Sequence, residues 1–126
     1  MVEFGLELTD TPEQALVQGK MKGMLLICYE HERPFQSTLG ELDWRFNGHF
    51  TQLLKKQVIT GQKGETVYCP LLWNENFFHF VIVGGGSEYS SDLLALGKKK
   101  IKELNLSQIG IQARDWNREG QSLWVS

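Results

Sequence analysis

A run of three glycines and a serine follows the most hydrophobic stretch of the sequence, residues 77–83. Backbone N–H groups in a turn of this kind, together with the start of a following helix, can bind a phosphate group. A dinucleotide fingerprint requires a further glycine where Tyr89 stands, and no Gly-Lys-Ser/Thr triplet is present. The alternative is a tight turn that only glycine permits, which lets a helix and a strand approach closely. The candidate ligand-binding residues are Gly84, Gly85, Gly86 and Ser87.

Four tryptophans form the second candidate site. Trp44 falls off the apolar stripe of its predicted helix, Trp73 follows Pro70, and Trp116 and Trp124 lie in a polar tail. Large aromatic side chains at such positions commonly anchor protein interfaces. Local packing beneath the tail explains them nearly as well, so both interpretations stand.

The histidines do not form a metal-binding pattern. His31, His49 and His79 fall on a predicted loop, helix and strand, and none has a second histidine three to five residues away. Alternation along the strand predicts that His79 points away from the face that carries Phe78 and Phe80. The sequence also lacks a Gly-x-Ser-x-Gly nucleophile motif. We therefore predict no metal, no cofactor and no catalytic residue.

Charge and composition narrow the class of protein further. Thirteen Lys and Arg against fifteen Asp and Glu give a net charge of -2, whereas a general nucleic-acid binder usually has a basic excess. The lysines at 98–102 are interpreted as a solvated helix face. Cys28 and Cys69 lie in apolar stretches, where a thiol acts as a small hydrophobe. The first ten residues do not resemble a signal peptide and no run is long enough to span a membrane, so we expect a cytoplasmic protein.

Strands and helices alternate along the predicted chain. The predicted strands are residues 2–8, 23–29, 65–69, 77–83, 109–113 and 122–125. Helices are predicted from Pro12 to about Gly19, over 39–56, and from about Ser90 to Leu104. Thr38 and Glu41 are a candidate capping box for the second helix, and Pro70 is expected to end the third strand. This order predicts one α/β domain over residues 1–126, a three-layer α/β/α sandwich with a mixed sheet of about five to six strands.

The stretch from Gly23 to Ala113 resembles the N-terminal domain of the leucyl (cytosol) aminopeptidase family, which has a macro-domain-like fold. The matching features, in the family's order, are the strand Leu25 to Tyr29, Leu42-Asp43 in a helix, the turn Gly61-Gln62-Lys63-Gly64-Glu65-Thr66, the strand Phe80 to Val83 running into Gly84-Gly85-Gly86, and a lysine-rich helix before the last strand.

In that family a separate C-terminal domain holds two catalytic metal ions, and this sequence stops where that domain would begin. Residues 115–120 superficially resemble its acidic metal motif, but their order and spacing differ, and we interpret them as a surface tail. The resemblance implies a non-catalytic accessory domain that associates with itself, as a homo-oligomer, or with a protein partner such as a full-length aminopeptidase. Macro-domain relatives that bind ADP-ribose suggest the alternative, a phosphate-bearing small ligand at the glycine run.

Overall fold

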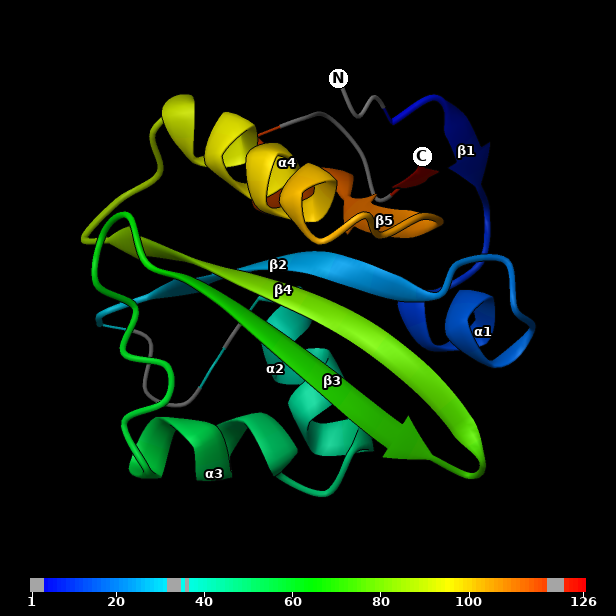
Figure 1. The fold of residues 1–126 in the computed structure, drawn as a ribbon, viewed down its shortest axis with the longest axis horizontal. Coiled ribbons are helices and arrows are strands. Elements are labelled where there is room, and N and C mark those ends of the chain that lie inside the picture. Colours follow the sequence, from blue (N-terminus) through cyan, green and yellow to red (C-terminus); the bar gives the residue numbers. More distant parts are fainter. Residues whose placement is uncertain (1–3, 32–34, 36, 118–121) are drawn as a thin grey trace.

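The computed structural model describes residues 4–31, 35, 37–117 and 122–126, which form one mixed sheet covered by helices (Figure 1). The strands are β1 (Leu6–Leu8), β2 (Gly23–Tyr29), β3 (Thr66–Trp73), β4 (Asn76–Gly86), β5 (Ile109–Gln112) and β6 (Leu123–Val125). The helices are α1 (Pro12–Val17), α2 (Thr38–Arg45), α3 (His49–Lys55) and α4 (Asp92–Glu103), and a 3-10 turn, η1, spans Ala113–Trp116. None of the helices in this described part of the chain has the length and apolar character needed to cross a membrane.

The six strands lie in the order β1-β6-β5-β2-β4-β3. β2 is parallel to both β4 and β5, and the remaining neighbours are antiparallel. Helices α1, α2 and α3 cover one face of the sheet and α4 covers the other, as Figure 1 shows. The predicted three-layer α/β/α sandwich is confirmed.

The central strand β2 explains why two cores form. Its side chains alternate between the faces, so that Met24 and Leu26 pack beneath α1 to α3 while Leu25 and Ile27 pack beneath α4. Nearly every residue of β2 is buried, as a strand covered on both faces requires. The continuous apolar run in the sequence predicted this position correctly.

The predicted helix over 39–56 is instead two helices, α2 and α3. Asn47 and Gly48 adopt left-handed backbone conformations with φ of 55° and 78°, which end one helix and start the next. The apolar period continues across the break because Phe46 and Phe50 still face the same core. The proposed capping box is also wrong, since Thr38 makes no such bond and Glu41 pairs with Arg114.

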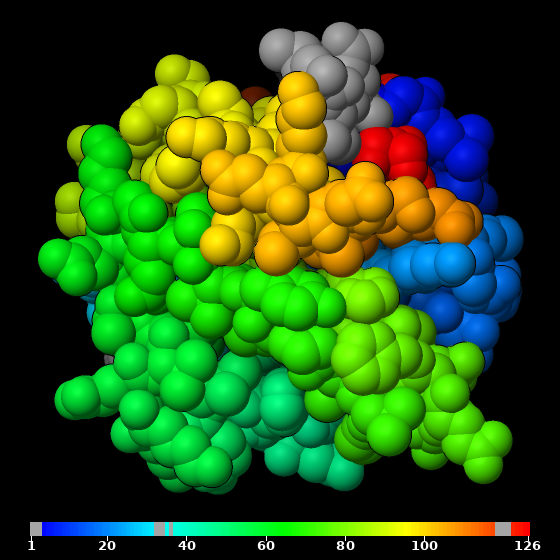
Figure 2. All heavy atoms as spheres, in the orientation of Figure 1, coloured from blue at the N-terminus to red at the C-terminus, as the bar shows by residue number. Residues whose placement is uncertain are grey.

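The strand that Pro70 was expected to end continues to Trp73. β3 lies at the edge of the sheet, where a residue without an N–H group is tolerated. Trp73 therefore belongs to a strand, paired with Asn76 of β4, and not to a loop. In Figure 2 this green strand and the yellow and orange α4 make up much of the visible surface.

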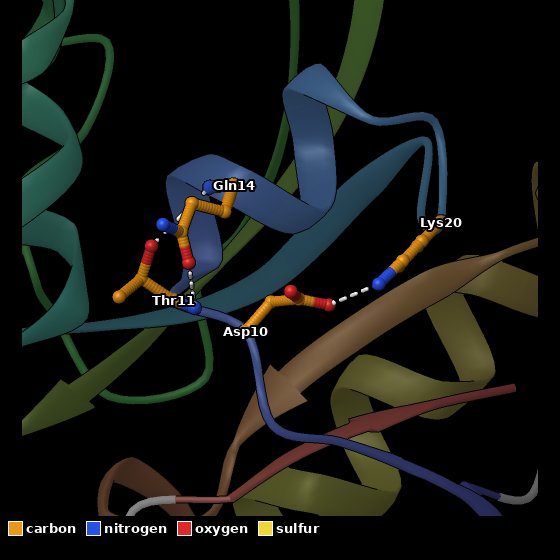
Figure 3. A network of polar contacts seen from close by, with 4 residues as sticks. All are labelled: Asp10, Thr11, Gln14 and Lys20. Atoms are coloured by element: carbon orange, nitrogen blue, oxygen red, sulfur yellow. Dashed lines mark hydrogen bonds and ion pairs between the residues drawn. The ribbon is translucent and has the colours of Figure 1, made fainter.

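The first helix begins where the sequence predicts, and Figure 3 shows why. The Thr11 hydroxyl accepts a hydrogen bond from the Gln14 N–H at 3.3 Å, and the Gln14 side chain accepts one from the Thr11 N–H at 3.2 Å. An ion pair of 2.7 Å between Lys20 and Asp10 joins the two ends of this segment. Of the strand expected at 2–8, residues 2 and 3 lie outside the described residues.

Candidate functional site

Trp44 is the most exposed large hydrophobic side chain of those described, with 78% of its surface accessible. It lies on the outer face of α2, as its place off the apolar stripe predicted. The guanidinium carbon of Arg45 stands 5.8 Å from the centre of its ring, a cation–π contact. An indole held in solvent by the fold costs hydrophobic free energy that a partner would recover.

Two hollows lie beside this tryptophan, which lines both of them. The larger, about 430 Å³, lies between α1 and α2 and is lined by Thr11, Pro12, Glu13, Glu41, Leu42, Trp44 and Arg45. The second, about 420 Å³, lies between α2 and the start of α3 and is lined by Phe35, Gly40, Asp43, Trp44, Asn47 and Gly48. We call Trp44 and these two hollows the Trp44 surface.

Polar contacts on either side of α2 hold the Trp44 surface in place. Arg45 pairs with Glu13 of α1, next to the capping box of Figure 3. On the other side, the Asp43 carboxylate accepts hydrogen bonds from the Thr51 N–H at 2.8 Å and from the Thr51 hydroxyl at 2.5 Å. These contacts join α2 to both neighbouring helices, so the surface is preorganised for binding.

The other three tryptophans have different surroundings. Trp73 packs against Phe46, with ring centres 5.2 Å apart, and is half-buried at the edge of the core. Trp124 of β6 is also half-buried, against the core under α4. Trp116 is 2% exposed, so the expectation that it anchors a partner is corrected: η1 turns its ring into the core.

The glycine run is not a loop, because β4 continues through Gly86. The Gly84 N–H donates to the Glu65 carbonyl at 2.7 Å, and the Gly86 N–H donates to the Gly61 carbonyl at 2.8 Å. Two of the three N–H groups that a phosphate would need are therefore already bonded to the turn before β3.

A close backbone approach explains the glycines instead. A Cβ atom on Gly84 would lie 2.0 Å from the Gln62 carbonyl oxygen, and one on Gly85 would lie 2.6 Å from the Tyr29 ring. Gly86 has a φ of 71°, which L side chains rarely adopt. The tight turn between a strand and a helix that the sequence suggested is therefore wrong, because the run lies within β4 and is crowded by Gln62, Lys63 and the Tyr29 ring.

A shallow hollow of about 320 Å³ does lie beside the end of β4. It is lined by Glu30, Lys63, Gly85, Gly86, Ser87, Glu88, Tyr89 and Ser90. At the start of α4 nearby, a hydrogen bond from the Ser90 hydroxyl lowers the pKa of Asp92, which keeps a negative charge there. The carboxylates of Glu30 and Glu88 on the wall and of Asp92 at the start of α4 repel a phosphate. Only Lys63 of the lining residues attracts it.

His79 and the two cysteines have structural surroundings. As predicted, His79 lies on the opposite face from Phe78 and Phe80, and its Nδ1 is 2.6 Å from the Tyr68 hydroxyl. Both cysteines are buried, and neither forms a disulfide. Burial raises the pKa of Cys69 to about 11, so the thiol stays protonated and unreactive.

A buried polar cluster at the start of α2 was not found from the sequence. The Thr38 N–H donates to the Asp115 carboxylate at 3.4 Å, and burial raises the pKa of Asp115. Among the described residues, Thr38 Oγ1, Asp115 Oδ2 and Trp116 Nε1 are buried without a hydrogen-bond partner. Asp115 is thus packed against α2 and is not part of a surface tail, while residues 118–120 of the same expectation lie outside the described residues.

Comparisons with known proteins do not identify a relative. No protein-family model matches the chain, and no curated protein matches it significantly. The resemblance to the aminopeptidase N-terminal domain remains a prediction from the sequence.

Proposed function

We propose that this chain is a non-catalytic protein-association domain that contacts its partner through the Trp44 surface. The observation that carries the proposal is a tryptophan, 78% exposed, that lines two hollows on a helix joined to both of its neighbours. Tryptophan and arginine are the residues that most often dominate binding energy at interfaces, and here they stand side by side.

Covering an indole removes on the order of 100 to 150 Å² of apolar surface from water, which is worth roughly 3 kcal/mol. The charged pairs Glu13–Arg45 and Glu41–Arg114 lie beside Trp44, are partly exposed to water and help to select the partner.

A phosphate-bearing ligand at Gly84 to Ser87 ranks second as a function. Backbone carbonyls occupy the N–H groups of Gly84 and Gly86, and the nearby carboxylates disfavour an anion. The resemblance to the aminopeptidase N-terminal domain agrees with association as the first choice, with another copy or a full-length aminopeptidase as partner.

Site-specific photo-crosslinking tests the proposal. The change Trp44→p-benzoylphenylalanine is made in the cells that produce the protein, with Leu72→p-benzoylphenylalanine as the control. Leu72 is matched in character, being apolar and 66% exposed, but it lies at the tip of the β3–β4 hairpin. We expect protein adducts from position 44 and not from position 72. Adducts from 72 alone, or none from 44, would contradict the proposal.

A further inference from the structure

The face of α2 that carries Trp44 also carries an acid and a base in a defined order. Glu41, Trp44 and Arg45 are three and four residues apart, so they share one side of the helix. All three line the larger hollow. Glu41 lies towards the start of α2, and Arg45 lies about 6 Å further along its axis.

This order determines which arrangement of two copies satisfies the charges. When two α2 helices run antiparallel across a two-fold axis, Glu41 of each copy faces Arg45 of the other. A parallel arrangement in register would instead place each charge beside its like. The face is therefore complementary to itself in the antiparallel arrangement alone.

We propose that the partner of the Trp44 surface is a second copy of this chain, with the two α2 helices antiparallel about a two-fold axis. This inference rests on the proposed association function and names its partner. The axis crosses the exposed face of α2 at a height midway between Glu41 and Arg45, so the two Trp44 rings lie side by side. Each ring then covers a hollow of the other copy.

The intramolecular ion pairs support this arrangement. Arg45 pairs with Glu13 and Arg114 pairs with Glu41, so both carboxylates and both guanidinium groups are held beside Trp44. In the dimer these separate pairs become one network that includes both copies. Networks of surface charges contribute more than isolated exposed pairs, which contribute little.

A charge exchange between two variants tests the geometry. Glu41→Arg gives a copy with two basic residues on this face, and Arg45→Glu gives a copy with two acidic ones. Each variant alone should dimerise at least about tenfold more weakly, because like charges then face each other twice. Mixed in equal amounts, the two variants should form a heterodimer about as tight as the wild-type dimer, measured by sedimentation velocity with one variant fluorescently labelled.

A matched control separates this geometry from general attraction between opposite charges. Lys99→Glu places the same charge change on α4, on the other side of the sheet, and a mixture of this variant with Glu41→Arg should show no rescue. A monomeric wild type at high micromolar concentration, or a dimer that the exchange does not rescue, would overturn the inference. Adducts from position 44 with a different protein would leave the association function standing and remove only the second copy as partner.

Discussion

The Trp44 surface and the glycine run at the end of β4 both have sequence features typical of binding sites, and they differ in what is left unsatisfied. At the glycine run, the N–H groups of Gly84 and Gly86 are bonded to backbone carbonyls, and the hollow beside them has two carboxylates on its wall. At the Trp44 surface, a large apolar side chain is held in water next to open hollows. Binding capacity follows from what the fold leaves exposed and unpaired, and a residue pattern alone does not define it.

The largest effect should come from filling the crowded glycine position. Gly84→Val places a Cβ 2.0 Å from the Gln62 carbonyl oxygen, so β4 or the turn must shift. We expect the free energy of unfolding in urea to fall by at least about 3 kcal/mol. Gly5→Ala is the control, since a Cβ there meets nothing within 4 Å, and it should change stability little. A Gly84→Val protein as stable as the wild type would show that close packing does not require glycine here, and would favour a ligand site at the glycine run.

Truncating two tryptophans should separate association from stability. Trp73→Ala removes a ring that packs on Phe46, so unfolding should become easier by about 2 kcal/mol while the dimerisation constant stays the same. Trp44→Ala removes a ring that is 78% exposed, so stability should stay within about 0.5 kcal/mol of wild type. Its dimerisation should weaken at least about tenfold. The opposite assignment of the two effects would move the interface to the β3 edge.

Replacing Asp115, whose carboxylate packs against the start of α2, should have a smaller effect, and this effect should be on stability and not on association. Because burial raises the pKa of Asp115, the folded chain binds more protons than the unfolded one, and stability falls as pH rises through this range. Asp115→Asn removes that loss and should stabilise the protein by about 1 kcal/mol at neutral pH. The gain should vanish below pH 3.8, the ordinary carboxyl pKa, where the acid is protonated in both states. Thermal unfolding across this pH range measures it, and a destabilised variant at neutral pH would show that the charge is stabilised in the fold.

The smallest expected effect is that of a phosphate-bearing ligand. ADP-ribose at about 1 mM should leave the melting temperature unchanged, because a ligand without measurable affinity for the folded state cannot stabilise it. Calorimetry with the same ligand should show no binding below millimolar concentration. A micromolar dissociation constant would reverse the ranking of the two proposed functions.

The elements set by local pattern were predictable from the sequence. β2 is apolar throughout and lies in the middle of the sheet, and α4 follows a regular helical period. The exposure of Trp44 followed from its place off the apolar stripe of α2. In these cases the residues that decide the structure lie within one or two turns or one strand.

What the sequence did not predict depends on contacts between distant segments. β3 passes through Pro70 because it is an edge strand, which is a property of the sheet order. The glycines belong to β4 because a turn some twenty residues earlier crosses over them. Trp116 is buried and Asp115 is half-buried because η1 turns back towards α2 and the core. The spacing of apolar residues within a single helix or strand does not reveal these contacts between distant segments.

The most direct test of the central claim is a dilution series followed by fluorine NMR of protein labelled with 5-fluorotryptophan. The chain has four tryptophans, so four signals are expected, each assigned with a Trp→Phe variant. We predict that the Trp44 signal shifts on dilution as its ring becomes exposed to water, while the signals of Trp73, Trp116 and Trp124 stay in place. A Trp44 signal that does not depend on concentration would contradict the account, as would a shift of Trp73 or Trp124 alone.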